Sequence, residues 1–215
     1  MVHFWIWFAK ITGWTVQFFC FRTKVYYENR ATCSRRIKGP AIIISNHTSV
    51  FDYAVYLFVF FSRTLRFQMA EVLYKNLLLG WFLRRMGGIY VDRDGFDFGF
   101  VTKSEEILAK GGVVGICPES RLPKPGEERP LEFKTSAAYI ALRADVPVIP
   151  VVTNGSYFNL KKRARVMIGE PINVCELSDP SLGEKEDLKN VSAKLRERII
   201  ELEKKLYEEG KKGKS

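Results

Sequence analysis

The stretch AIIISNHTSVFD, residues 41–52, sets an apolar run directly before a group of polar side chains. The run itself, Ala41–Ser45, is short and follows the pair Gly39-Pro40, which ends the preceding segment. Such a run is typical of a strand that is buried on both faces of a parallel sheet. The polar residues after it would then lie at the carboxyl end of a strand, where α/β sheets bind their ligands.

Similar apolar runs recur along the chain and alternate with stretches of helical periodicity. The further expected strands are residues 65–69, 88–92, 113–117, 148–152 and 165–168. The expected helices are residues 51–61, 71–86, 97–110 and 133–144. This alternation predicts an α/β fold with a largely parallel central sheet flanked by helices.

The composition agrees with a globular chain that can build its own core. Of the 215 residues, 47% are hydrophobic and 27% are charged, which excludes a disordered, collagen-like or coiled-coil protein. No uninterrupted apolar stretch reaches roughly 18 residues, which excludes a multi-span membrane protein. The four cysteines lack the spacing of zinc ligands and are interpreted as free thiols of a reducing cytoplasm.

Positive charge and aromatic residues are concentrated at the front of the chain. Residues 1–38 hold seven basic residues and one acidic residue, so they carry +6 of the net charge of +10. Residues 4–21 read FWIWFAKITGWTVQFFCF and contain three of the four tryptophans. A signal peptide is disfavoured, because the basic residues follow the apolar stretch and no small-residue cleavage site appears.

The polar residues of this segment favour a helix that lies in a membrane interface. One polar side chain recurs every seven positions: His3, Lys10, Gln17 and Lys24. On a helix these would form a single stripe, and the remaining circumference would be apolar and aromatic. With its basic flank, such a helix fits the headgroup region of an anionic membrane. Two alternatives stay open: a membrane-spanning helix, for which this length is marginal, and an N-terminal core helix of a soluble protein.

The C-terminal part predicts a second amphipathic helix. Its apolar side chains are spaced by three and four positions: Leu188, Val191, Leu195, Ile199, Leu202 and Leu206. We expect this stripe to pack on the body, and a coiled-coil dimer is the alternative. The chain is accordingly divided into an N-terminal membrane-interface helical segment (residues 1–38), an α/β domain (residues 39–182) and a C-terminal amphipathic helix with a charged tail (residues 183–215).

His47 and Asp52 are the candidate catalytic pair. On one continuous helix they would point about 140° apart, so they can meet only if His47 lies in the loop and Asp52 in the first turn of the next helix. An Asp bonded to one imidazole nitrogen fixes the tautomer and leaves the other nitrogen as a base. The only other histidine, His3, lies in the N-terminal segment. A histidine that merely caps the loop is the alternative.

Four blocks resemble the motifs of the glycerolipid acyltransferases, most closely the 1-acyl-sn-glycerol-3-phosphate (lysophosphatidic acid) acyltransferases. They are His47-x-x-x-x-Asp52, MGGIYVDR at residues 86–93, ICPE at residues 116–119 and VPVIPV at residues 146–151. The blocks come in the family's order over about half of the chain. The α/β domain is therefore identified as an acyltransferase domain, with residues 39–182 as its bounds.

The resemblance implies a reaction and a set of site residues. A fatty acyl group would pass from acyl-CoA or acyl-carrier protein to the hydroxyl of lysophosphatidic acid, giving phosphatidic acid in phospholipid biosynthesis. His47 would be the general base and Asp52 its orienter, while backbone amides near residues 46–49 would stabilise the oxyanion. The implied substrate-binding residues are Asn46, Ser49, Arg93, Glu119 and Arg121.

Two of these residues have more specific expected roles. Arg93 would hold the acceptor phosphate, because its planar guanidinium is always charged. Glu119 would hydrogen-bond the glycerol hydroxyl or brace Arg93. The family's third block usually reads Pro-Glu-Gly-Thr-Arg, whereas residues 118–121 read PESR. Either Ser120 replaces Gly and Arg121 replaces Thr, or one residue is missing.

The expected context is the cytoplasmic face of a membrane, with the protein held there as a peripheral or monotopic protein. We expect no cofactor or metal beyond the thioester co-substrate, and no nucleic acid partner. Two alternatives stay open. The same chemistry could act on glycerol-3-phosphate, a headgroup-bearing lysophospholipid or an amino-acid lipid. The second alternative is a non-catalytic module that binds lipid or nucleic acid. The intact His47 and Asp52 argue against a loss of catalysis, and the tryptophan-rich N-terminal segment argues for a membrane over nucleic acid.

Overall fold

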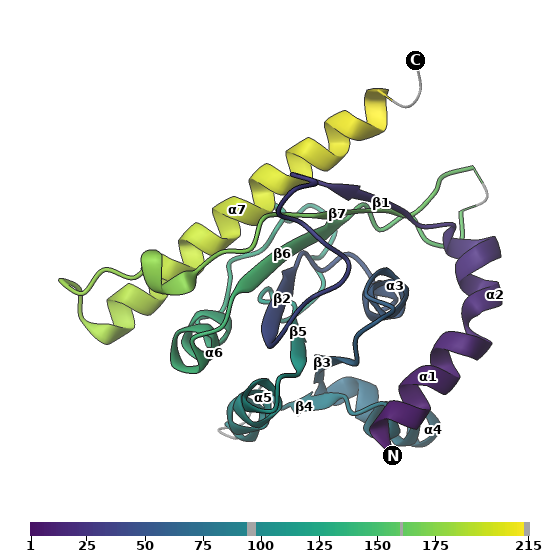
Figure 1. The fold of residues 1–215 in the computed structure, drawn as a ribbon, viewed down its shortest axis with the longest axis horizontal. Helices are drawn as coiled ribbons and strands as arrows, with labels where there is room; N and C mark the ends of the chain where they lie inside the picture. Colours follow the sequence, from purple (N-terminus) through teal and green to yellow (C-terminus); the bar gives the residue numbers. More distant parts are fainter. Residues whose placement is uncertain (94–97, 160, 213–215) are drawn as a thin grey trace.

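The computed structural model describes residues 1–93, 98–159 and 161–212. Within these residues, seven strands form one sheet in the order β1-β7-β6-β2-β5-β3-β4 (Figure 1). Neighbouring strands are parallel except β6 and β7, which are antiparallel. The strands are β1 (Lys24–Tyr27), β2 (Ala41–Ser45), β3 (Leu65–Ala70), β4 (Ile89–Val91), β5 (Val113–Ile116), β6 (Val148–Thr153) and β7 (Arg165–Ile168).

The predicted α/β fold with a largely parallel sheet is confirmed. Strand β2 lies in the middle of the sheet, where β5 and β6 flank it, and all five of its residues are buried. Ile43 points into the core on one face of the sheet, and Ile42 and Ile44 point into the core on the other. Burial on both faces explains why this strand reads as a continuous apolar run.

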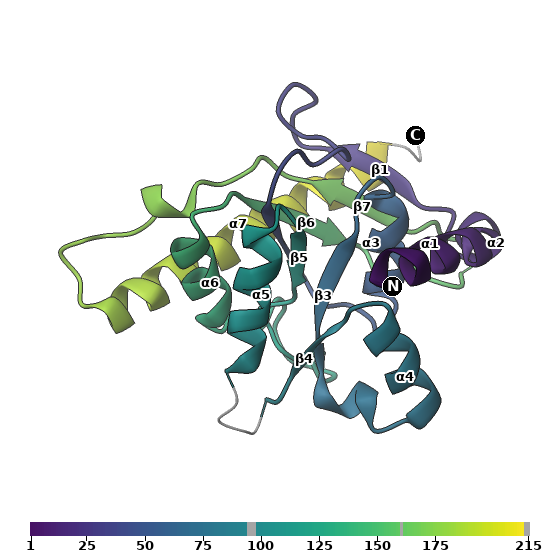
Figure 2. The ribbon, with the colours of Figure 1, turned by 60° about the horizontal axis from the view of Figure 1, so that its bottom comes forward.

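Helices cover both faces of the sheet. Helices α5 (Gly99–Ala109), α6 (Ser136–Ala144) and α7 (Glu184–Lys212) lie on one side, and α3 (Asp52–Val59) lies on the other with the N-terminal helices (Figure 1). Helix α4 (Leu77–Arg85) belongs to the connection between the paired strands β3 and β4 at the sheet edge, and it lies close to the N-terminus (Figure 2). The stripe predicted for α7 faces the core, where Val191, Leu195 and Ile199 are fully buried.

Two predictions about elements were wrong. Residues 71–86 do not form one helix: a 3₁₀ turn at Glu71–Tyr74 is followed by α4, because Asn76 adopts extended backbone and its side chain accepts a hydrogen bond from the amide of Leu79. An Asn that caps in this way begins a new helix. The sequence analysis also did not predict β1, which pairs with β7 at the sheet edge and lies within the segment assigned to the membrane.

The N-terminal segment buries one residue of its polar stripe, Lys10, against the protein. Helix α1 (Val2–Thr12) is followed by the short α2 (Trp14–Val16) and a π-helical turn at Gln17–Phe21, after which Lys24 opens β1. Lys10 is 1% exposed, and its ammonium donates to the carbonyls of Phe61 (2.6 Å) and Arg63 (2.8 Å), just beyond the end of α3. The stripe was expected to follow one helix, but Lys24 lies in β1; Lys10 joins the segment to the body, whereas His3 and Lys24 are exposed.

The inner face of this segment is part of the core, while its outer face is apolar and exposed. Ile6 and Phe21 are buried in the same core cluster as α3. On the outer face, large apolar side chains are exposed: Phe4, Trp7, Phe8, Ile11, Trp14, Phe18 and Phe19. Among the described residues, no helix combines the length and apolarity needed to cross a bilayer. All four cysteines are free thiols, as predicted.

Candidate active site

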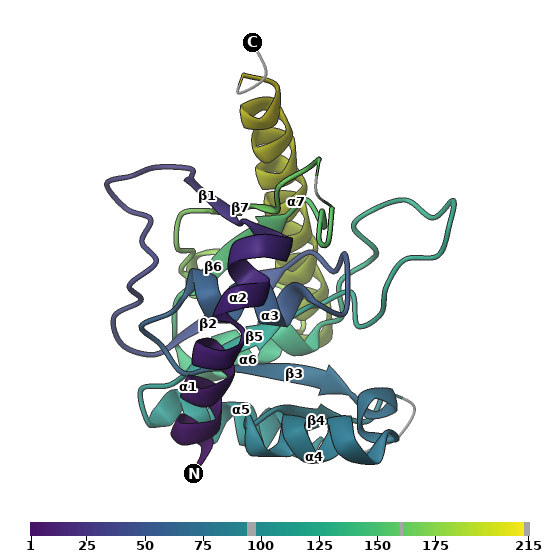
Figure 3. The same cartoon turned by 90° about the vertical axis from the view of Figure 1, so that its right-hand side faces the viewer.

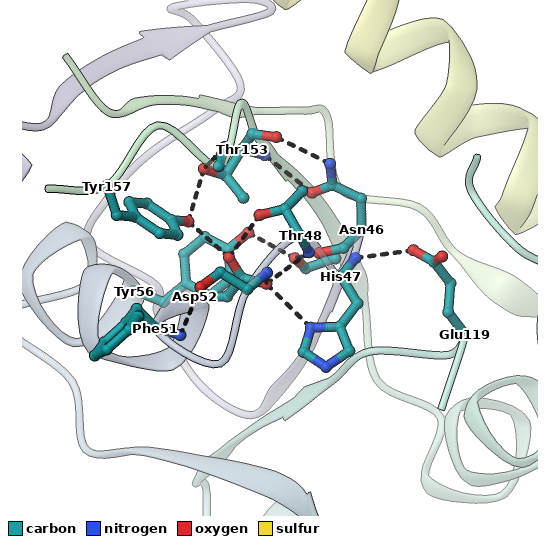
Figure 4. Close-up of polar contacts among 12 residues, drawn as sticks. Asn46, His47, Thr48, Phe51, Asp52, Tyr56, Glu119, Thr153 and Tyr157 are labelled. Atoms are coloured by element: carbon teal, nitrogen blue, oxygen red, sulfur yellow. Dashed lines mark hydrogen bonds and ion pairs between the residues drawn. The ribbon is translucent and has the colours of Figure 1, made fainter. Parts of the chain in front are cut away.

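The candidate site lies at the carboxyl ends of β2, β5 and β6 (Figure 4). His47 follows β2, Glu119 follows β5, Thr153 ends β6 and Asp52 opens α3. These strands are neighbours in the sheet and parallel, so residues distant in sequence meet at one edge. The prediction that polar residues after buried runs converge there is confirmed.

His47 and Asp52 contact each other in the predicted geometry. His47 lies in the loop and Asp52 in the first turn of α3, and Nδ1 of His47 is 3.1 Å from Oδ2 of Asp52. A carboxylate only accepts hydrogen bonds, so Nδ1 donates and Nε2 carries the free lone pair. Figure 4 shows the second ring nitrogen facing away from Asp52. The imidazole is 23% exposed, whereas the Asp52 side chain is 2% exposed. This arrangement can abstract a proton from a hydroxyl that approaches Nε2.

Four further groups hold the Asp52 carboxylate. Its Oδ2 accepts from the amides of Thr48 (2.8 Å) and Ser49 (3.0 Å). Its Oδ1 accepts from the Thr48 hydroxyl (2.8 Å) and from the Tyr157 hydroxyl (2.7 Å). Burial and the charge of Asp52 raise the pKa of Tyr157, which keeps its hydroxyl a neutral donor. The sequence analysis missed Tyr157, because nothing in the pattern links two residues 105 positions apart.

Glu119 supports the backbone of the site, a contact that neither of the roles expected for it included. It is 3% exposed, and its two oxygens accept from the amides of His47 (2.8 Å) and Leu131 (2.8 Å). These bonds hold the carboxylate inside the fold, and Arg93 forms its ion pair with Glu71. Glu119 therefore fixes the position of His47 through its main chain.

Asn46 and Ser49 also serve the local structure. The Asn46 side chain is buried and bonds both main-chain groups of Thr153: its Oδ1 accepts from the amide and its Nδ2 donates to the carbonyl, each at 3.0 Å. Ser49 Oγ accepts from the amide of Phe51 (3.2 Å). The expected oxyanion donors are engaged as well, because the amides of residues 47–49 bond Glu119 and Asp52. Asn46 and Ser49 were predicted to bind the substrate, and the contacts described here are with the protein itself.

Arg93 joins the second and third sequence blocks. Its guanidinium forms a two-pronged contact with Glu71, with Nη2 2.9 Å from Oε1 and Nε 3.1 Å from Oε2, and Nη1 donates to the carbonyl of Ser120 (3.3 Å). The hydrogen bonds from Arg93 lower the pKa of Glu71 to about 2. Glu71 was not singled out from the sequence, because a Glu beginning a predicted helix is ordinary.

Arg121 and Ser120 clarify the unusual third block. Arg121 contacts Glu127 through two hydrogen bonds of 2.7 and 2.8 Å, and both side chains are partly exposed. Ser120 has φ of 58°, a left-handed conformation that favours glycine. Ser120 thus occupies the backbone conformation for which the family's Gly is suited, which favours replacement over a missing residue.

The described residues contain no group of three His, Cys, Asp or Glu side chains that could hold a metal ion. The thiol of Cys117, beside the site, is buried, and this burial raises its pKa well above the usual value. His47 is thus the group at this edge of the sheet that combines access with a free lone pair.

An α/β sheet with a histidine held by a buried carboxylate at its carboxyl edge has the geometry that a general base requires. Comparison with known proteins identifies the family. The sequence model of the Acyltransferase family matches residues 22–154, and the chain belongs to this family.

Named relatives are similar over much of the chain. The human 1-acyl-sn-glycerol-3-phosphate acyltransferase beta is 27% identical over 159 residues, which are 72% of this chain and 56% of the human one. The 1-acyl-sn-glycerol-3-phosphate acyltransferase of Bacillus subtilis is 28% identical over 146 residues, which are 66% of this chain and 70% of that one. The chain thus spans little more than half the length of the human relative.

A solved structure has the same fold. The crystal structure of the lysophosphatidic acid acyltransferase PlsC from Thermotoga maritima superposes with a TM-score of 0.58 at 23% identity. The match covers 94% of this chain and 79% of that one. The mostly parallel sheet with flanking helices is therefore the architecture of a known acyltransferase.

The Tyr157 contact generates a prediction about catalysis. Replacing Tyr157 with Phe removes one of the hydrogen bonds on Asp52 and keeps the ring packing. A net hydrogen bond of this kind contributes about 0.5–1.5 kcal/mol, so we expect kcat for acyl transfer to fall by about two- to tenfold. The matched control is Tyr207→Phe on the exposed side of α7, which should leave kcat unchanged. Equal kcat values for Tyr157→Phe and Tyr207→Phe would show that the Tyr157 hydroxyl does not contribute to catalysis.

Proposed function

We propose that this protein transfers a fatty acyl group from the thioester of acyl-CoA or acyl-carrier protein to the free hydroxyl of lysophosphatidic acid. The product is phosphatidic acid, an intermediate of phospholipid biosynthesis. The observation that carries the proposal is the His47–Asp52 pair, with Nε2 of His47 accessible and Nδ1 held by a buried carboxylate. The names of the relatives support lysophosphatidic acid as the acceptor.

The reaction needs one proton shuttle and no covalent enzyme intermediate. Nε2 of His47 takes the proton of the acceptor hydroxyl while the oxygen forms a bond to the thioester carbonyl carbon. The tetrahedral intermediate then collapses, the carbon–sulfur bond breaks, and the leaving thiolate takes the proton from His47. Asp52 holds the imidazole in the correct tautomer and stabilises the imidazolium between the two steps. The thioester is already activated, so the proposal requires no metal or cofactor.

Arg93 is proposed to hold the phosphate of the acceptor. The guanidinium is partly exposed and follows β4 at the same edge of the sheet as His47. Glu71 and the Ser120 carbonyl hold the guanidinium in a defined orientation. An oriented, permanently charged group matches the oxygens of a phosphate better than a flexible ammonium does.

The protein is proposed to bind the surface of a membrane from the cytoplasmic face, without crossing it. The exposed apolar side chains of α1 and α2 are continued by those of α4, which are Leu77, Leu78, Leu79 and Trp81. The two groups meet where the rings of Trp5 and Trp81 pack 5.1 Å apart with Arg85 above them. Helices α1, α2 and α4 share one side of the molecule (Figures 2 and 3). An aromatic and leucine-rich surface edged by arginine fits an anionic bilayer.

The base is tested by replacing His47 and Asp52 in the purified protein, with acyl-CoA and lysophosphatidic acid as substrates. His47→Ala should abolish transfer, and Asp52→Asn should lower kcat by about 10⁴-fold, as loss of an orienting Asp does in catalytic triads. Circular dichroism and thermal melting should show that the His47→Ala protein is folded. Substantial transfer by folded His47→Ala protein contradicts the mechanism.

The acceptor site is tested by Arg93→Ala, with phosphorylated and neutral lyso-acceptors compared side by side. We expect kcat/KM for the phosphorylated acceptor to fall by at least about tenfold, because a charge-assisted contact contributes about 1.5–3 kcal/mol. The neutral acceptor should be affected far less. Arg143→Ala, which breaks a surface Arg–Glu pair with Glu105, is the matched control. An unchanged preference between the two acceptors would place the phosphate elsewhere.

Membrane binding is tested without deleting the N-terminal segment, since Ile6 and Phe21 belong to the core. The double replacement Leu77→Ser with Leu78→Ser should lower partitioning into vesicles that contain anionic lipid by at least about tenfold, given the apolar area removed. High salt should weaken binding only in part. Tyr207→Ser, an exposed aromatic of α7, is the control and should bind normally. If the double variant sediments with vesicles like the control, α4 does not contact the bilayer.

A further inference from the structure

The long C-terminal helix α7 extends two polar side chains toward the segment that carries His47. Arg196 and Glu203 are seven positions apart, so they lie on nearly the same face of the helix, about 20° out of line. Both are partly buried, and each bonds a group that leads to the site. The apolar side chains of α7 pack this helix on the sheet, so neither charged residue is needed for that packing.

The first connection runs from Glu203 through Asn46. Nδ2 of Asn46 donates to Oε1 of Glu203 and also to the carbonyl of Thr153. A side-chain amide has two N–H donors, so Asn46 has both engaged. Asn46 is 2% exposed, and losing one acceptor would leave a donor without a partner inside the protein. Since Asn46 directly precedes His47, the position of the base depends on this contact.

The second connection runs from Arg196 through a loop to Glu119. The guanidinium of Arg196 donates to the carbonyls of Pro130 (2.6 Å from Nη2) and Leu131 (3.0 Å from Nε). The amide of Leu131 in turn donates to Glu119, whose other oxygen accepts from the amide of His47. Both connections act on the peptide unit that enters His47, one through the side chain of Asn46 and one through the amide of His47.

We propose that α7 is a positioning element for the catalytic base, and that Arg196 and Glu203 are the positioning residues through which it acts. Neither residue touches the reacting atoms. They hold residues 46 and 47 so that Nε2 of His47 points at the acceptor hydroxyl. The expected change in kcat rests on the acyl-transfer function proposed above, whereas the expected change in the position of His47 does not.

The chemistry of the two contacts sets what each variant should do. Gln at position 203 still offers a carbonyl oxygen to Asn46, whereas Met fills the same space on α7 without an acceptor. Glu203→Met should therefore lower kcat by about ten- to a hundredfold with KM changed less than about twofold, since small displacements of a base cost that much. Glu203→Gln should restore kcat to within about threefold of the wild type. Glu197→Met, at an exposed position of α7, is the matched control.

A second arm tests whether Glu203 acts through Asn46. In an Asn46→Ala background, adding Glu203→Met should lower kcat by less than about twofold further, because the contact is already gone. Arg196→Met probes the other connection and should also lower kcat rather than raise KM. If the Glu203→Met protein does not fold, Arg196→Met still tests the proposal. Independent, multiplying losses from Asn46→Ala and Glu203→Met would overturn the proposed connection.

The geometry has its own readout, because the chain contains two histidines. In nitrogen–proton spectra of the imidazoles, the His3→Gln protein assigns the signals of His47. Glu203→Met should shift the ring signals of His47, and Glu203→Gln and Glu197→Met should leave them near the wild-type values. If folded Glu203→Met keeps both the His47 signals and kcat, the contact stabilises the fold only and the proposal is wrong. If the signals shift but no form of the protein transfers acyl groups, the positioning stands and the proposed function fails.

Discussion

The carboxylate of Asp52 accepts hydrogen bonds from five donors, and the site cannot be assembled without it. Two donors are backbone amides of the loop, two are hydroxyls, and the fifth is the imidazole of His47. A buried carboxylate costs several kcal/mol unless its lone pairs are satisfied. The loop after β2 folds around Asp52 for this reason, and the fold that satisfies the charge is also the one that orients the base. Catalytic geometry and local stability therefore depend on the same contacts.

This dependence explains why residues expected to touch the substrate serve the protein instead. The amides of residues 47–49 looked suited to an oxyanion, yet each already bonds Asp52 or Glu119. Glu119 looked suited to a glycerol hydroxyl, yet it joins the ends of β2 and β5 by accepting two amides. Polar groups this deeply buried need partners at all times, including when no substrate is bound. The imidazole of His47 is the group of this cluster that stays partly exposed and keeps a lone pair, and it is the one proposed to meet the substrate.

The features that were predictable from sequence are those fixed by local pattern. The strand at residues 41–45 and the meeting of His47 with Asp52 follow from a short apolar run and the start of a helix, and both are correct. Contacts between distant segments left no such pattern. Tyr157 reaches Asp52 across 105 positions and Glu203 reaches Asn46 across 157, and a Tyr in a loop or a Glu in a charged helix looks ordinary. Strand β1 was missed for a related reason: as an edge strand it is half-buried, so its residues lack a continuous apolar run.

The N-terminal segment shows how one helix can satisfy two environments. A periodic polar stripe was interpreted as the side that faces lipid headgroups and water, but the ammonium of Lys10 is buried, where it caps two carbonyls beyond α3. The apolar circumference is thereby left outside, and it is continuous with that of α4 through the contact of Trp5 with Trp81. Five residues, 72–76, link Glu71 to the start of α4, and Glu71 orients Arg93. A bilayer that contacts α1 and α4 would therefore bring its headgroup layer near the guanidinium proposed to bind phosphate, so that the acceptor reaches His47 without leaving the membrane.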